Sequence, residues 1–157
     1  MNDEKEAILA AVRTRIETLR LEAKGMVDDH WKFYLEESDA RRDFADKSRL
    51  FPRIATTKNG FAIEWYYIRK WFKDKKEKWK KVTRYVSRGR SFRTNLEARA
   101  KPWELDVVTD FENRAEMIRR EVTFLSVTIE SYDRFDRLQE KRAEAALSEG
   151  LHYSGPV

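Results

Sequence analysis

The chain contains no cysteine, only five glycines and only three prolines in 157 residues. The absence of cysteine excludes disulfides, thiolate metal sites and cysteine nucleophiles. Because glycine and proline are scarce, there is little turn chemistry, and long uninterrupted helices are expected. No run approaches the roughly 20 apolar residues of a membrane span, and the first residues are acidic rather than signal-like. These features predict a cytoplasmic protein with no membrane partner.

Histidine is scarce too, since His30 and His152 are the only two and lie far apart in the sequence. A zinc site would need both of them together with carboxylates, so neither a metal nor another cofactor is expected. Charged residues and large aromatic residues are abundant: 39% of the chain is charged, and it has five Trp, six Tyr and nine Phe. Each large ring buries on the order of 150–250 Å². A chain of this length therefore predicts a single domain, built on few core positions.

The charges are segregated along the chain. Residues 47–101 hold 18 Lys and Arg against 4 Asp and Glu, a net charge of +14. The remaining 102 residues hold 15 basic and 24 acidic side chains, a net charge of −9. Solubility alone would not require this segregation, so the asymmetry favours a partner that is negatively charged, with nucleic acid first. An acidic protein or a membrane surface, or no partner at all, are the alternatives.

Two stretches outside the basic residues have the spacing of a coiled-coil seam, with alternating gaps of 3 and 4. They lie within residues 3–47 and 102–149, and their apolar positions are Leu9, Val12, Ile16, Leu19, Ala23, Met26, His30 and Phe33, and Val108, Phe111, Ala115, Ile118, Val122, Leu125, Ile129 and Tyr132. Each seam spans about 36 Å of helix. The equal lengths favour an antiparallel hairpin of the two arms, and a homodimer through these arms is the alternative. Residues 150–157 lack periodicity and are expected to form a flexible tail.

The basic residues between the arms have the pattern of β-strands. A strand over residues 51–57 is followed by Asn59 and Gly60, a pair that favours a type I′ hairpin. Residues 61–72 and 79–86 predict two further strands, joined by a polar turn. A short helix, with Asn95 as its cap, is expected within residues 91–101.

The predicted fold class is α+β: two long antiparallel helices in a coiled-coil-like hairpin flank a three-stranded antiparallel β-meander, in the order α-β-β-β-(α)-α. The whole chain is expected to form a single elongated domain. It has an N-terminal arm at residues 3–47, a basic β-meander with a short helix at 48–101, and a C-terminal arm at 102–149.

Cations interleaved with aromatic residues make the strands a candidate nucleic-acid-binding surface. Phosphate binding needs several cations on a rigid surface, and alternate residues of paired strands project from one face. The candidate binding residues are Arg69, Lys70, Lys73, Lys78, Lys80, Lys81, Arg84, Arg88, Arg90 and Arg93, with Tyr66 and Tyr85. Exposed rings would stack on bases, worth about 1–3 kcal/mol per base. Packing of Trp65, Trp71 and Trp79 against the helices is the preferred interpretation of the tryptophans.

The sequence offers little for catalysis. A metal-dependent nuclease gathers carboxylates around Mg²⁺, but Glu64 in the second strand has no second carboxylate at a matching spacing. Neither a glycine-rich phosphate loop nor a nucleophile elbow is present. The tyrosines of the strands have no histidine cluster nearby to hold the metal that strand transfer requires. The sequence therefore predicts a protein that is not an enzyme.

Three short motifs carry a resemblance to a known family: Ile63-Glu64-Trp65-Tyr66, Val86-Ser87-Arg88-Gly89-Arg90-Ser91-Phe92 and Ala100-Lys101-Pro102-Trp103-Glu104. In these the sequence resembles the MobI family of conjugative-transfer proteins. The resemblance implies a DNA-binding accessory protein that acts at the origin of transfer beside a separate relaxase. The basic strands would then contact double-stranded DNA, and the acidic arms would meet the relaxase, a second copy or another DNA-processing protein. The alternative is a coiled-coil adaptor that binds an acidic protein.

Overall fold

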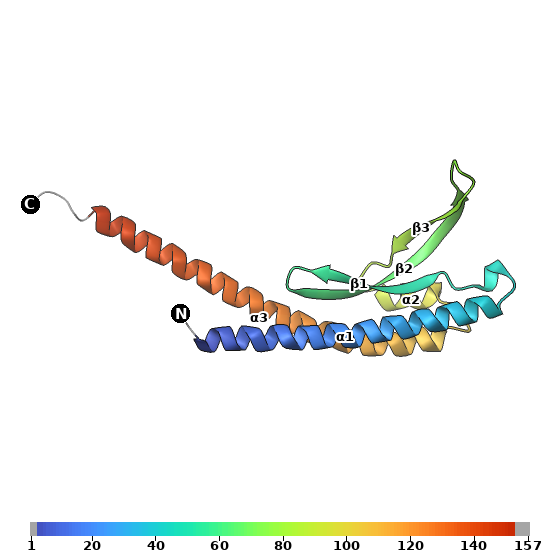
Figure 1. Cartoon of the computed structure of the whole chain (residues 1–157), viewed down its shortest axis with the longest axis horizontal. Coiled ribbons are helices and arrows are strands. Elements are labelled where there is room, and N and C mark those ends of the chain that lie inside the picture. Colours follow the sequence, from blue (N-terminus) through green and yellow to red (C-terminus); the bar gives the residue numbers. More distant parts are fainter. Residues whose placement is uncertain (1–2, 153–157) are drawn as a thin grey trace, which may run out of the picture.

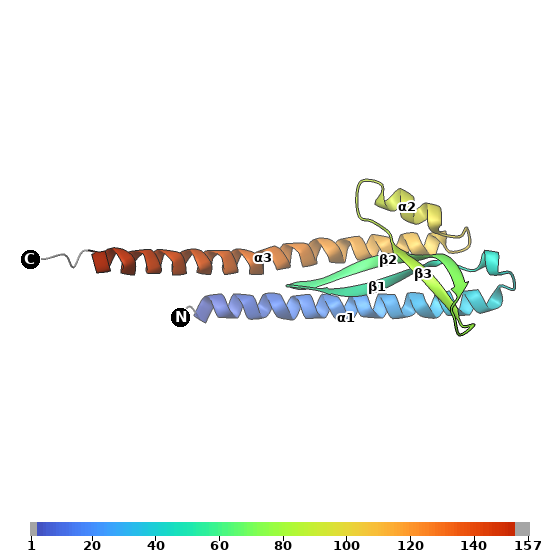
Figure 2. The same cartoon turned by 90° about the horizontal axis from the view of Figure 1, so that it is seen from above.

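The computed structural model describes residues 3–152, with side chains to residue 150. Its elements are α1 (Asp3–Ala40), a short 3-10 helix η1 (Phe44–Asp46), β1 (Leu50–Thr57), β2 (Gly60–Lys73), β3 (Trp79–Tyr85), α2 (Phe92–Arg99) and α3 (Leu105–His152). The described chain is thus α+β, with three α-helices and a three-stranded antiparallel sheet in the order β1-β2-β3, as predicted. Figures 1 and 2 show α1 and α3 side by side in opposite directions, with the sheet across one side of the pair.

The two long helices differ from the prediction at their ends. α1 stops at Ala40 rather than near residue 47, seven residues beyond Phe33, the last position of the predicted seam. α3 continues to His152, so the start of the predicted flexible tail is helical; residues 153–157 lie outside the described part. Its last turns are rich in Ala, Glu, Leu and Arg, which favour helix without any packing partner. Figure 2 shows α3 extending past the N-terminus of α1.

The seams supply most of the core, but they pack on the sheet as well as on each other. The rings of His30 and Phe111, one from each helix, lie 5.2 and 5.1 Å from the ring of Trp65 in β2. An ion pair between Arg15 and Glu121 also joins α1 to α3. The two helices therefore act together as a platform for β2. Coiled-coil geometry between them stays a prediction.

The first hairpin does not have the predicted turn. Thr57 pairs with Gly60, so the two turn residues are Lys58 and Asn59. A type I′ turn needs positive φ at both of these positions. Among the described residues only Glu77, elsewhere in the chain, has positive φ, so the type I′ prediction is wrong. Gly60 is required for another reason: a Cβ there would lie 3.0 Å from the Ser126 hydroxyl oxygen of α3. The glycine lets the hairpin approach this helix closely.

The sheet bends where β2 leaves the helices. Its pairing with β3 shifts register between Ile68 and Lys70, which makes Arg69 the residue of a β-bulge. Beyond this point the β2–β3 hairpin rises away from α1 and α3 (Figure 1). We call this hairpin, residues 69–84, the ribbon.

The short helix α2 packs on α3 through Phe92 and Leu96, which are buried. The predicted cap is wrong, because Asn95 lies inside the helix and donates its backbone N–H to the carbonyl of Ser91 (2.8 Å). At the start of α3, the buried carboxylate of Glu104 accepts the backbone N–H of Lys101 (2.8 Å). No helix in the described residues is both long and apolar enough to cross a membrane.

Candidate nucleic-acid interface

The turn at the tip of the ribbon is built around Asp74. Its carboxylate accepts the backbone N–H groups of Lys76 (2.8 Å) and Lys78 (2.9 Å). The hydrogen bond from Lys78 is the main reason that the pKa of Asp74 lies below its usual value. Glu77 has a φ of 60°, the left-handed conformation that usually falls to glycine or asparagine. One of the two acids of the ribbon is therefore used to close the turn, and the other occupies a strained position.

Positive charge dominates the ribbon. Residues 69–84 contain nine Lys and Arg against two Asp and Glu. Seven of the predicted binding residues lie here, and all seven are exposed: Arg69, Lys70, Lys73, Lys78, Lys80, Lys81 and Arg84. The cross-strand register places Lys70 and Lys80 on one face, and Lys73 and Lys81 on the other. The ribbon thus presents cations on both faces.

Aromatic rings gather on the face of the sheet opposite Trp65, where the buried ring of Phe51 also lies 5.3 Å from the ring of Trp31 in α1. Tyr66 and Tyr85, the two predicted tyrosines, are paired across the strands with ring centroids 5.7 Å apart. The ring of Phe51 stacks on Tyr66 at 5.9 Å. The guanidinium of Arg53 lies 4.7 Å from the centroid of Tyr66, and the ammonium of Lys81 lies 5.3 Å from that of Phe51. Cation–π contacts of this kind hold charged groups at fixed positions on the surface.

The tryptophans do not share one environment. Trp65 is fully buried, as the preferred interpretation predicted. The same interpretation is wrong for Trp71 and Trp79, which are 36% and 65% exposed, because the long helices α1 and α3 do not cover the ribbon. Trp71 contacts the ring of Phe44 at 5.9 Å, and the ammonium of Lys73 lies 5.2 Å from the ring of Trp79.

The three remaining predicted arginines follow the ribbon, and two of them contact α3. Arg93 donates to the side-chain oxygen of Asn113 (2.6 Å) and lies 3.4 Å from a carboxylate oxygen of Glu116. Arg88 lies 4.0 Å from a carboxylate oxygen of Glu112, and burial lowers the pKa of its guanidinium. Arg90 is exposed in the loop between them. The structure therefore separates Arg88 and Arg93 from the ribbon cations.

A buried cluster that the sequence did not reveal anchors β2 to α3. Glu112 is almost fully buried and accepts the indole N–H of Trp65 (2.9 Å). Arg119 donates to both carboxylate oxygens of Glu112 and to the carbonyl of Ile63 (2.9 and 3.0 Å). The buried polar side chains of this cluster all form hydrogen bonds, and these bonds fix the base of the sheet from which the ribbon projects.

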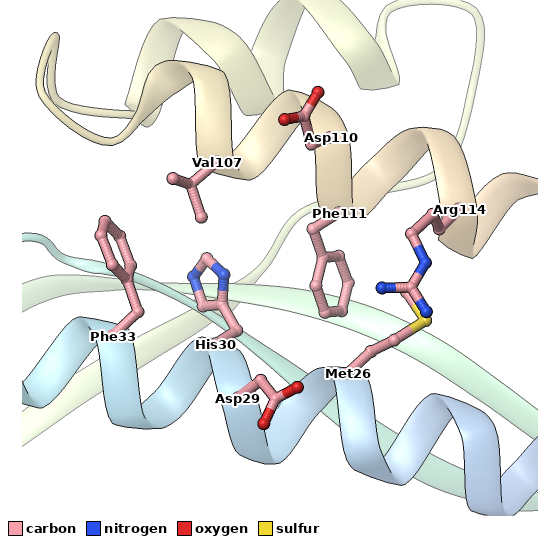
Figure 3. A pocket seen from close by; sticks show the side chains of 8 residues that line it. All are labelled: Met26, Asp29, His30, Phe33, Val107, Asp110, Phe111 and Arg114. Atoms are coloured by element: carbon pink, nitrogen blue, oxygen red, sulfur yellow. The ribbon is translucent and has the colours of Figure 1, made fainter.

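A cavity of about 270 Å³ lies between α1 and α3, away from the interface (Figure 3). His30 lines it, is 4% exposed, and neither of its ring nitrogens has a hydrogen-bond partner. Burial lowers the pKa of His30 to about 4, so the ring is neutral at pH 7. Within residues 3–150, no cluster of three or more His, Cys, Asp or Glu side chains is arranged to hold a metal ion.

Fold and interface together define a small elongated α+β protein in which a helical platform presents a basic, aromatic β-ribbon. The family model described as MobI protein matches residues 19–133, which include the whole sheet, α2 and most of both seams. The chain therefore belongs to the MobI family, as the three motifs predicted, and is a mobilisation-related protein. Neither a curated protein nor a solved structure matches it.

Proposed function

We propose that this MobI-family chain is a DNA-binding accessory protein of conjugative transfer, which contacts duplex DNA at the origin of transfer beside a relaxase. The observation that carries the proposal is the ribbon, with nine basic and two acidic residues on a hairpin that rises away from the long helices. DNA as the partner also implies the cytoplasm as the place of action. In this proposal the relaxase supplies the chemistry, and the chain itself is not an enzyme.

The shape of the ribbon supports contact with a groove of the duplex. The major groove of B-DNA is about 12 Å wide and admits a two-stranded β-ribbon. The cations of the ribbon can reach the phosphate backbones that border the groove, since Lys70 and Lys80 project from one face and Lys73 and Lys81 from the other. Contacts to phosphate orient the protein on the duplex without reading its sequence.

The charge of the rest of the molecule supports one orientation. The residues outside 47–101 carry a net charge of −9 and would be repelled by phosphate. The ribbon end would therefore face the DNA while the arms point away from it. The arms are then free to meet the relaxase or a second copy of the chain.

A second candidate function, a coiled-coil adaptor for an acidic protein, is favoured by a different observation. From its middle towards its C-terminus, α3 exposes the rings of Phe124 and Phe135 and the side chain of Leu138. DNA binding through the ribbon would not use these apolar groups. An adaptor would use them for one partner and the ribbon for a second, acidic one.

The decisive test replaces Lys70, Lys80 and Arg84 by Ala in the full chain. These side chains are exposed, and none of them packs in the core. If each contacts one phosphate, the slope of log affinity against log salt falls by about 2.7, at roughly 0.9 per phosphate. Affinity for the duplex at low salt is expected to fall at least tenfold, measured by mobility shift, while the melting temperature stays within about 2 °C of the parent.

The matched control removes three other exposed charges, Lys32, Arg137 and Arg142, from the helices. This control should bind duplex DNA as the parent does. Unchanged binding in the ribbon variant would refute the site. If the parent binds neither duplex nor single-stranded DNA at 50 mM salt, yet associates with a partner protein, the adaptor is the better function. An origin-of-transfer duplex compared with a scrambled one reports any base-specific reading.

A further inference from the structure

A second basic site lies at the base of the ribbon, between β2 and α2. It is a pocket of about 440 Å³, lined by Arg49, Tyr67, Ile68, Arg69, Ala98 and Arg99. The three arginines come from three separate segments: the residue before β1, the bulge of β2 and the last turn of α2. No carboxylate lines the pocket.

The positive charges of the three arginines are not paired with carboxylates in the described part of the chain. Within the described part of the chain, none of Arg49, Arg69 and Arg99 forms a salt bridge, although most arginines of the arms do. Like charges that converge on one pocket repel each other, and this costs free energy unless an anion lies between them.

Two features of the pocket favour the binding of a ligand. The guanidinium of Arg99 stacks on the ring of Tyr67, 3.5 Å from its centroid, so its orientation is fixed before any ligand arrives. The Nε–H of Arg49 is buried and has no hydrogen-bond acceptor. A buried donor without a partner destabilises the protein, and an incoming acceptor would remove this penalty.

We propose that this arginine pocket binds a phosphate group. The planar fork of arginine matches two phosphate oxygens at once, and three such forks with no facing carboxylate select an anion of high charge density. The inference rests on the proposed function for the source of the phosphate, which is the backbone of the DNA that the ribbon contacts. Because Arg69 begins the ribbon, a phosphate held here sets the angle at which the ribbon meets the duplex.

The first arm of the test titrates inorganic phosphate into the full chain at constant ionic strength and follows the arginine Nε–H resonances by NMR. Saturable shifts are expected for Arg49 and Arg99, and the Arg99→Gln variant should bind phosphate at least tenfold more weakly. The matched control is Arg41→Gln. Arg41 also stacks on an aromatic ring, at 3.6 Å from the centroid of Trp103, but its guanidinium is already paired with Glu37.

The second arm uses duplex DNA and the double variant Arg49→Gln/Arg99→Gln, which leaves Arg69 and the other ribbon cations in place. Loss of one phosphate contact lowers the salt slope by about 0.9. Should the double variant unfold in circular dichroism, Arg99→Gln alone replaces it. A lowered slope identifies a DNA phosphate as the ligand.

The two arms separate this proposal from the proposed function. Saturable phosphate binding in a parent that does not bind DNA would keep the pocket and refute the DNA function, with free phosphate then the source. Two results would overturn the pocket even if the ribbon binds DNA. One is phosphate shifts that are equal in parent and Arg99→Gln; the other is no saturable shift together with an unchanged salt slope.

Discussion

The two halves of β2 are both rich in aromatic residues, but they have opposite environments. Residues 61–68 bury Phe61, Ile63 and Trp65 under the helices, whereas residues 69–73 are all exposed, including the ring of Trp71. Both halves are rich in aromatic side chains, so aromatic content does not decide which half forms the core. The decisive factor is coverage: the seams of α1 and α3 face the first half, and the strand turns away from them at the bulge.

Because of this difference, the first half of β2 contributes to the stability of the fold, and the second half is available for binding. The first half is held by the rings of His30 and Phe111 and by the buried hydrogen bond to Glu112. The second half carries charges that repel one another and that only solvent, or an anionic partner, compensates. Changes in the first half should therefore affect folding, and changes in the ribbon should affect binding.

The largest expected effect compares two tryptophans on either side of the bulge. Trp65→Ala should lower the free energy of unfolding by about 3–5 kcal/mol, because it opens a cavity and leaves Glu112 without the indole donor. Trp79→Ala should lower it by less than about 1 kcal/mol, the value of an exposed cation–π contact. Urea denaturation measures both. Equal losses would mean that the ribbon folds as part of the core, and the division between the halves would be wrong.

The next effect concerns His30, which belongs to the buried half alone. Its pKa is about 4 when folded, against 6.5 for an ordinary histidine, so the unfolded chain binds more protons between these values. Stability is therefore complete above pH 6.5 and falls as the pH drops towards 4, by about 3 kcal/mol from this residue at 1.36 kcal/mol per pKa unit.

The variant His30→Leu isolates this contribution, since Asp29, Asp110 and Arg114 around the same cavity remain in both proteins. The free energy of unfolding of the parent should fall more steeply with acid than that of the variant between pH 6.5 and 4. Parallel pH profiles would show that the histidine is not desolvated in solution. DNA binding by the ribbon, which contains no histidine, should not follow this profile.

Much of the fold could be predicted because its signals are local. Seam spacing located both long helices, and alternating residues located the three strands. The turn type could not be predicted, because Gly60 is needed for contact with Ser126, which is distant in the sequence, and not for its own φ.

The candidate site was predicted less completely for the same reason. A run of positive charge does not reveal that Arg93 pairs with Glu116 or that Arg88 lies beside Glu112. Glu112 gave no signal either, since it stands next to a seam position and looks like any charged residue of a helix. The arginine pocket unites residues 49, 69 and 99 through the fold, and only Arg69 belonged to the predicted set.

The smallest effect lies at the tip of the ribbon, where Glu77 adopts positive φ. Gly is free of the steric cost that a side chain has in this conformation, so Glu77→Gly should stabilise the turn by up to about 1 kcal/mol. Hydrogen exchange should show up to about fivefold slower exchange at the amides that close the turn, Asp74 and Lys78, and no change at Trp65. The control Glu77→Gln removes the charge and keeps the strain, so it should leave exchange unaltered. Slower exchange throughout β2 would mean that the turn and the rest of the strand open together. A change confined to the turn supports two halves of β2 that differ in stability as well as in their contact with the helices.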